Sequence, residues 1–559
     1  MSANFAPSRY IPHSAAPPTD IKAVRHRIHD ALIENIERVH RHPSSHPRVY
    51  VGSAGEIIMD MRAFAALPTH SFTTYTPTSS LIAVPFHEPQ HGSHVSYLET
   101  SIGPATLVLV RQLRLRQNPD SNAHKHARRG KLDSEVLEEL ELQETWRGAA
   151  DLISGAIELA TMEEPDEDGC EVLYGRAGLL YALLLLRSDL LLTLNYLSHA
   201  GKPKDRVVRE VESLCSDENV KALVDDIMQR GELGGKRYAE ELEASEREQA
   251  PPLMWKWHGS RYLGAAHGVV GILHQVLHAP SHIIAPHWSK ILSTVEWLLA
   301  IQDPLGNWPS KAGRHMPYVS GGAAAQQESK RIGVDEEYDD ALVQWCHGAT
   351  GFLIFFSALL RRAAQSPQTC ALPSTLHDSL IAALKRAGEL VYTRGLLRKG
   401  VGLCHGVGGS VYGLLAVSDV LDPPAPAHDV QEKYWLARAV HLADLATDYQ
   451  AMTQKGQMAV PERPYSLYEG VAGMCCAWAE VLMRLPNGNG NGNGSESGHG
   501  GGSLHLHGSI HIPGTARRRG SGDDSGIRNG NGNADANDIA NGDKRRGGMP
   551  GFDDIVLLD

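Results

Sequence analysis

The sequence predicts an all-α protein, an α/α toroid built as a double barrel of seven inner and seven outer helices. The first observation behind this prediction is a repeated Gly-x-x-Gly motif followed by an apolar run, which would supply one inner helix per copy. The second is a set of amphipathic stretches between the copies, which would supply the outer helices. The first glycines of the six full copies are Gly52, Gly175, Gly268, Gly348, Gly406 and Gly470, and a seventh, degenerate copy keeps only Gly103.

Successive copies lie about 51 to 93 residues apart, which leaves room for two helices in each unit. An open solenoid would show a regular period and a distinct polar cap at each end, and the sequence shows neither. The irregular units therefore favour a closed ring.

The first outer helix is expected to follow Asp20, a good N-cap residue. From there to Val39, apolar residues recur at helical spacing with charged residues and histidines between them. Similar patterns predict outer helices near 134–161, 287–302, 375–392 and 432–449. The segment 65–98 is rich in proline, threonine and histidine, and it predicts no clear outer helix.

These elements divide the chain into four parts. Residues 1–44 hold an N-terminal segment with the first outer helix, and residues 45–486 form the barrel. Residues 487–548 are rich in asparagine and glycine and have few groups that could form a core, so we expect them to be disordered. Residues 549–559 are short and apolar, which would let them dock on the barrel.

Charge and hydropathy limit the partners that we expect. The formal net charge of −12 and the pI of about 6.2 argue against a nucleic-acid partner, which would usually need a basic surface. The first residues carry neither a secretory signal nor a glycine at position 2 for myristoylation. The most apolar run, 177–194, contains Arg187 and Asp189 and so indicates a buried core helix. We expect a cytoplasmic protein, with only peripheral association with the plasma membrane if there is any.

The motif copies place reactive side chains in one register. In the full copies, the residue before the first glycine is Val51, Tyr174, His267, His347, His405 or Glu469. Cys346 and Cys404 stand two positions before their glycines. Because equivalent positions should lie at the same end of the barrel, we expect these side chains to gather there. The seven cysteines are an odd number spread thinly along the chain, which favours reduced thiols over disulfides.

Two thiolates and an imidazole are typical ligands of zinc. Cys346, Cys404 and His405 would leave the fourth tetrahedral position open, as in catalytic sites, whereas adding His347 would close the site into a structural one. We favour the open site, because closed sites usually have two cysteines in one tight loop and here the cysteines are far apart in the sequence. An open zinc can bind water or a substrate thiol and lower the pKa of either.

Two further residues of the register have two interpretations each. His267 is a candidate catalytic acid or base close to the metal, or a histidine whose hydrogen bonds are satisfied at a helix start. Glu469 would orient a metal ligand, or cap its own helix in line with the helix dipole, and we favour capping.

The motifs LYGRAG, GAAHGVVG, WCHGATG, GLCHGVGG and SLYEGVAG, in this order, resemble those of the eukaryotic LanC-like proteins, relatives of the bacterial lanthionine cyclases. The resemblance covers about residues 45–486. It implies the double ring of helices and one zinc ion bound by Cys346, Cys404 and His405. The segment 65–98 and the Asn/Gly-rich insertion depart from the family pattern, which affects surface contacts more than the metal site.

The resemblance also implies a reaction. Members of the family activate a thiol on zinc and add it to a dehydroalanine or dehydrobutyrine residue of a peptide, which forms a thioether. The eukaryotic relatives are associated with glutathione as the thiol. The position of His267 matches the family's proposed proton donor or acceptor, and Lys399 matches a lysine that contacts glutathione.

The leading hypothesis is therefore a zinc-dependent enzyme that adds glutathione or another thiol to dehydroamino acids in proteins or peptides. The first alternative is a non-catalytic, zinc-containing LanC-like receptor or scaffold that binds glutathione or signalling partners. The second is a toroid enzyme of another chemistry, such as a glycosidase-like or prenyltransferase-like barrel. A glycosidase would need two facing carboxylates, and the register offers only Glu469.

Overall fold

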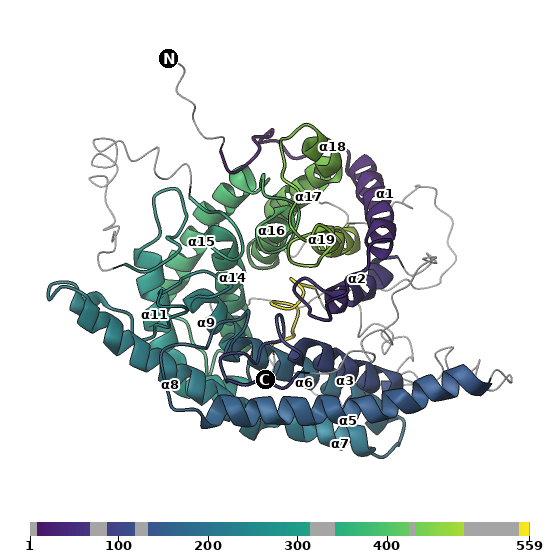
Figure 1. Ribbon diagram of the computed structural model, residues 1–559. Helices are drawn as coiled ribbons and strands as arrows, with labels where there is room; N and C mark the ends of the chain where they lie inside the picture. The colour runs from purple at the N-terminus through teal and green to yellow at the C-terminus, as the bar shows by residue number, and fades with distance from the viewer. Residues whose placement is uncertain are drawn as a thin grey trace, which may run out of the picture.

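The computed structural model describes residues 8–67, 87–117, 132–313, 341–423, 432–485 and 547–557, and of 132–144 it describes the backbone alone. Within these ranges the chain forms helices, short 3-10 helices and isolated β-bridges, and no strand. The helices form two concentric layers (Figure 1). The all-α toroid expected from the sequence is confirmed.

Seven helices form the inner layer. They are α2 (Ser53–Ala66), α3 (Ile102–Gln117), α6 (Arg176–His199), α9 (Val269–Leu277), α14 (Ala349–Gln365), α16 (Val407–Leu421) and α19 (Val471–Arg484). Each packs on the next in chain order, and α19 packs on α2, so the ring is closed (Figure 1). In the six full motif copies the first glycine is the N-cap of the inner helix, as expected from the sequence.

The outer layer covers the ring. Its main helices are α1 (Ile21–His40), α5 (Leu132–Met162), α8 (Asp217–Glu241), α11 (Trp288–Ala300), α15 (Ser374–Arg394) and α17 (Tyr434–Leu445). Shorter helices accompany them: α7 (Arg206–Leu214), α10 (Ser281–Ile284) and α18 (Tyr449–Gln454), with 3-10 turns at Arg247–Gln249, Ala285–His287 and Ala446–Asp448. The five outer helices predicted from amphipathic patterns are present, whereas α7 and α8 were missed.

One unit differs from the others. Between α2 and α3 the described residues 87–101 form turns and bends, so no outer helix is found in that part. The remaining residues of the atypical segment, 68–86, lie outside the described residues. Described outer helices therefore precede six of the seven inner helices.

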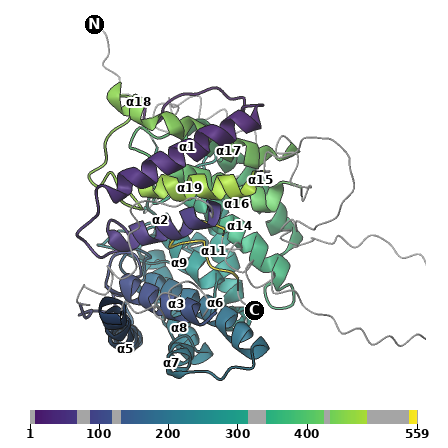
Figure 2. The ribbon, with the colours of Figure 1, turned by 90° about the vertical axis from the view of Figure 1, so that its right-hand side faces the viewer.

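The outer helices bury one face each. In α1 the Asp20 carboxylate accepts a hydrogen bond from Ala23 N at 2.9 Å, which caps the helix, and Ile28 and Leu32 are fully buried. Burying such a side chain contributes about 1.5–3 kcal/mol. In the view turned by 90° (Figure 2), α1 lies beside α19, the helix that it contacts most, and it also contacts α17 and α2.

Helix α6 is the one described helix that is long and apolar enough to cross a membrane by length and composition. Its most apolar window is 78% buried inside the protein, because α6 is a member of the inner ring. Asp189 within it is buried and paired with Arg114 at 3.2 Å. The helix is thus part of the protein core, as the charged residues in the run suggested.

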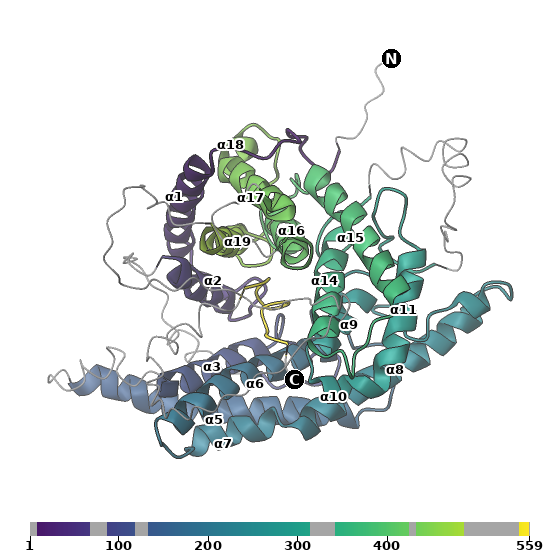
Figure 3. The ribbon, with the colours of Figure 1, turned by 180° about the vertical axis from the view of Figure 1, so that it is seen from behind.

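The C-terminal segment 547–557 lies inside the inner ring (Figures 1 and 3, yellow). Met549 and Phe552 are fully buried there, and the Tyr468 hydroxyl donates to the Pro550 carbonyl at 2.9 Å. Asp554 accepts from the Tyr181 hydroxyl at 2.6 Å and pairs with Arg62 of α2 at 2.9 Å. The segment is therefore held by inner helices from several sides. The Asn/Gly-rich stretch before it lies outside the described residues, apart from its last two positions.

Candidate metal centre

The loops that precede the inner helices are joined by backbone hydrogen bonds. Cys346 N donates to Cys404 O at 3.2 Å, and Cys404 N donates to Tyr468 O at 2.8 Å. In the same way, Tyr468 N donates a hydrogen bond to Tyr50 O at 3.1 Å. All four residues stand two positions before the first glycine of their motif copies. Position −2 of one unit thus contacts position −2 of the next, which brings the two cysteines together although they are 58 positions apart in the sequence.

Two glycines make this close approach possible. A Cβ added at Gly264 would lie 2.1 Å from the carbonyl oxygen of Cys346, so the loop carrying His267 can touch the loop carrying Cys346 only through glycine. Gly348 has a φ of 92°, a conformation that side chains with a Cβ rarely adopt. It turns the chain from Cys346 and His347 into α14.

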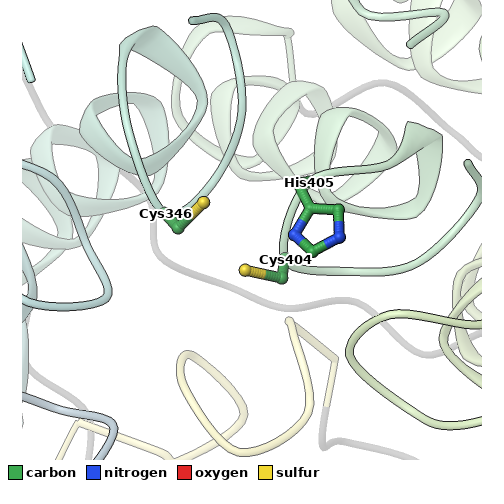
Figure 4. Close-up of side chains that lie close together, drawn as sticks. All are labelled: Cys346, Cys404 and His405. Atoms are coloured by element: carbon green, nitrogen blue, oxygen red, sulfur yellow. The ribbon is translucent and has the colours of Figure 1, made fainter. Parts of the chain in front are cut away.

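Cys346, Cys404 and His405 form a compact cluster (Figure 4). Their two sulfur atoms and an imidazole nitrogen all lie within 4.8 Å of one another. Both cysteines are buried, whereas His405 is half-buried. The Gln344 amide donates to the Cys346 sulfur at 3.2 Å, a contact suited to a thiolate. The cluster therefore has a buried sulfur side and a more open imidazole side.

The two cysteines differ in acidity. A hydrogen bond from the Cys404 thiol lowers the pKa of Cys346 despite burial, and the Lys399 ammonium lowers it further. Burial, followed by the interaction with Cys346, raises the pKa of Cys404 well above its usual value. The cluster thus releases its first proton from Cys346.

His347 stands apart from the cluster. Among the described residues, the group of ligand atoms within 4.8 Å contains Cys346, Cys404 and His405 and leaves His347 out. The His347 ring lies against Tyr262, with ring centroids 5.5 Å apart. Burial, followed by the neighbouring charges of His267, Lys311 and Lys399, lowers the pKa of His347 to about 4. The geometry agrees with three protein ligands rather than four.

His267 is oriented by a carboxylate. Its Nδ1 lies 3.0 Å from Glu171 Oε2, and the Glu171 side chain is fully buried. The same carboxylate accepts hydrogen bonds from Leu173 N at 2.7 Å and Tyr174 N at 2.6 Å. An acceptor held in this way takes a hydrogen bond from Nδ1–H, which leaves the Nε2 lone pair of a neutral His267 free. The His267 side chain is 22% exposed, so it is accessible.

The family model described as "Lanthionine synthetase C-like protein" matches residues 136–483, well over half of the chain. The chain belongs to the lanthionine synthetase C-like family. This LanC-like chain is 26% identical over 314 residues to "Glutathione S-transferase LANCL1" of Danio rerio, a match that covers 56% of the chain and 59% of the relative. It is 30% identical over 335 residues to "LanC-like protein GCL1" of Arabidopsis thaliana, covering 58% of the chain and 60% of the relative. The chain thus spans about three fifths of the length of these relatives.

Aromatic rings surround His267 in this LanC-like barrel. The Trp257 ring is parallel to the imidazole, with centroids 6.0 Å apart, and Tyr174 is parallel to it at 6.5 Å. Tyr262 lies at 5.7 Å on a tilted plane and joins His267 to His347. These rings, which the motif search did not single out apart from Tyr174, form one wall beside the metal cluster.

The other predicted site residues lie at the same end of the LanC-like barrel. Lys399 is exposed, and its charge acts on both Cys346 and His347. Glu469 is half-buried, and within the described residues its carboxylate forms no hydrogen bond with the cluster or with the first turn of α19. The two roles expected of Glu469 therefore stay predictions.

Two functional candidates were missed by the sequence reasoning. Glu171 precedes its motif glycine by four positions, outside the register that was compared, and it pairs with a residue 96 positions away. Tyr50 occupies the position that is cysteine in the fifth and sixth units. Burial raises the pKa of its hydroxyl, and the interaction with Cys404, which includes a hydrogen bond, raises this pKa further. Comparing position −2 in all copies would have found Tyr50.

Proposed function

We propose that this protein is a zinc-dependent enzyme that adds glutathione, or another thiol, to dehydroalanine or dehydrobutyrine residues of peptides or proteins. The observation that carries the proposal is the cluster of Cys346, Cys404 and His405 beside the Glu171–His267 pair. Two sulfur atoms and one imidazole nitrogen suit zinc, and three protein ligands leave a position for a substrate. Zinc held there would lower the pKa of a bound thiol and so supply a thiolate nucleophile.

Basic side chains near His347 suit the binding of a thiol that carries carboxylates. Lys311 lies over the Tyr262 ring with its Nζ 4.7 Å from the centroid, and Lys399 is exposed nearby. Both lower the pKa of His347, which indicates that both ammonium groups lie near that ring. Glutathione carries two carboxylates, so its binding would be favoured by these ammonium groups. The printed name of the Danio rerio relative supports glutathione as the thiol.

His267 would move the proton in this reaction. Addition forms a bond between the thiol sulfur and the β-carbon of the dehydroamino acid, and the C=C electron pair passes to the α-carbon as an enolate. His267 Nε2 would take up the thiol proton and return it to the α-carbon, so that one S–H bond is replaced by one C–H bond. Glu171 keeps Nδ1 protonated throughout and stabilises the imidazolium. The parallel Trp257 ring offers a flat surface for the planar acceptor.

We also propose that the protein acts in the cytoplasm. All seven cysteines are free thiols and buried, which suits a reducing compartment. Localisation of a tagged full chain by microscopy and fractionation would test this, and recovery in an oxidising compartment would contradict it.

The reaction is tested with the full chain, a peptide containing dehydroalanine, and glutathione. Zinc is measured in the purified protein, and mass spectrometry follows the appearance of the glutathione adduct. Cys404→Ala should lose both zinc and adduct formation, whereas the matched control Cys215→Ala, which removes a buried thiol bonded to Val211 O, should keep both.

Two results would contradict the proposal. A folded protein without zinc would exclude the metal, and zinc without adduct would exclude the reaction. The scaffold alternative would be favoured if Cys404→Ala lost zinc and still bound every cellular partner. The Glu171–His267 pair argues against that alternative, because a scaffold has no need of an oriented proton carrier.

A further inference from the structure

A second group of potential metal ligands lies inside the ring. His274 lies on α9, and His278, one helical turn later, is the C-cap residue of that helix. Both face Asp553 of the C-terminal segment. One ligand atom from each lies within 4.8 Å of the other two. The side chains of both histidines are fully buried, and that of Asp553 is 4% exposed. This group shares no residue with the centre at Cys346, Cys404 and His405.

The hydrogen bonds of His278 leave one ring nitrogen without a donor or acceptor. Its Nδ1 lies 2.8 Å from the backbone carbonyl of His274, so Nδ1 must carry the proton. Its Nε2 has no hydrogen-bond partner and lies 3.6 Å from Asp553 Oδ1. A nitrogen lone pair therefore faces a carboxylate oxygen in the protein interior, where unpaired polar atoms are costly.

His274 can present a lone pair to the same space. Its Nε2 lies 3.3 Å from Asp553 Oδ1 and 3.2 Å from the Phe552 carbonyl, and its Nδ1 has no partner. Moving the proton from Nε2 to Nδ1 would give up the hydrogen bonds to Phe552 O and Asp553 and leave the Nδ1–H without an acceptor, a cost that a metal bound at Nε2 would have to offset. The Phe552 carbonyl would keep the donor Gln275 Nε2 at 3.0 Å.

The carboxylate is held in place by a cation outside the group. Arg361 Nη2 lies 2.8 Å from Asp553 Oδ1, and Arg361 also lies 3.8 Å from Asp419 of α16. Asp419 is paired in turn with Arg484 of α19. Outer partners of this kind commonly orient metal-binding carboxylates, and Asp419 offsets the charge of Arg361.

We propose that His274, His278 and Asp553 form a second divalent-metal site, for zinc, which fastens the C-terminal segment to α9. Two imidazoles and one carboxylate are ligands that zinc accepts, and a helix places histidines four residues apart on one face. The backbone carbonyl bonded to His278 Nδ1 fixes the tautomer that a metal needs. Zinc would satisfy the unpaired Nε2.

The site would act structurally. The Phe552 ring stacks on His274 with centroids 4.2 Å apart, and it contacts Trp345 edge-on at 5.1 Å. Trp345 is adjacent to Cys346 in the chain. A metal at Asp553 would thus fix the part of the C-terminal segment that packs on Trp345, next to Cys346 of the first centre. The metal would also stabilise the folded state, because the unfolded chain cannot bind it equally well.

The test counts metal ions in the full chain and assigns each by spectroscopy. Zinc analysis should give two equivalents per chain, and the double variant Cys346→Ala/Cys404→Ala should retain one. In a Co²⁺ titration of the zinc-free protein, the thiolate-to-cobalt charge-transfer band should saturate with one equivalent, and a second should add only ligand-field absorption. His278→Gln and Asp553→Asn should lose this second equivalent and keep the charge-transfer band.

His282→Gln is the matched control, because this exposed histidine pairs with Asp217 on the surface and should leave the metal content unchanged. Two results would overturn the proposal: a single zinc that disappears with the cysteines, or a second equivalent that survives both His278→Gln and Asp553→Asn. Should these variants fail to fold, the Co²⁺ titration of the unmodified chain still decides. No readout depends on thiol transfer, so this proposal and the proposed function can fail separately.

Discussion

Replacing Glu171 by Gln should slow thiol addition without removing the metal. The variant exchanges the charge-assisted hydrogen bond at 3.0 Å from His267 Nδ1 for a neutral one. Hydrogen bonds to charged groups contribute about 1.5–3 kcal/mol and neutral ones about 0.5–1.5 kcal/mol, so the exchange should cost about 1–1.5 kcal/mol, or about fivefold to tenfold in rate if the interaction is made fully in the transition state. Because Glu171 touches His267 and not the cysteines, we expect kcat to fall and KM for glutathione to stay near its original value.

The assay is steady-state kinetics of adduct formation, with zinc content and thermal unfolding measured on the same samples. The substituted amide also faces Leu173 N and Tyr174 N, so some loss of stability is expected as well. Glu171→Asp keeps the charge and should recover part of the rate. A folded, zinc-containing Glu171→Gln enzyme with an unchanged kcat would refute the role assigned to the pair.

Three further predictions concern the thiol, the metal and pH. Lys399→Ala should raise KM for glutathione about twofold to fivefold, as expected for an exposed charge pair, and leave kinetics with uncharged 2-mercaptoethanol unchanged; equal effects on both thiols would contradict this. Chelation should abolish thiol addition but preserve the far-ultraviolet circular dichroism, because helix packing and backbone hydrogen bonds close the ring; loss of helicity would contradict that. A hydrogen bond from Arg261 and a second one from Lys256 lower the pKa of Glu241 to about 2, although partial burial of the carboxylate raises it. The stabilisation is present above the ordinary pKa of 4.5 and is lost as pH falls toward 2. After solvent screening, Glu241→Gln should cost about 0.5–1 kcal/mol at pH 7 and nothing near pH 2 by denaturant titration; a constant difference would contradict this assignment.

Much of the fold follows from local sequence. The inner helices were predictable because each combines a glycine start with an apolar run, and the outer helices because their apolar residues keep helical spacing. Helix α8 was missed although Ser216 caps it, since Gly231, Gly234 and Gly235 interrupt its pattern. Those glycines are needed for tertiary contact: a Cβ at Gly231 would lie 2.3 Å from the Trp255 ring. Local propensity could not reveal that requirement.

The site was predictable only where one register repeats. Cys346 and Cys404 occupy equivalent positions of successive units and His405 follows Cys404 directly, so the register was enough to predict that they come together. Glu171 and the group around Asp553 depend on contacts between parts of the chain that no repeat relates. His274 and Asp553 come together only because the end of the chain returns through the ring, and no spacing rule indicates that path.

The chain end that occupies the ring also ties together helices that are not neighbours around it. Arg62, Tyr181, His274 and Arg361 hold this segment from α2, α6, α9 and α14. These four helices are therefore braced against one another through the centre of the toroid as well as along its wall. Under the proposed function, the segment would also occupy space on the axis, so that an acceptor would have to approach the cluster from the end of the barrel that carries the motif loops.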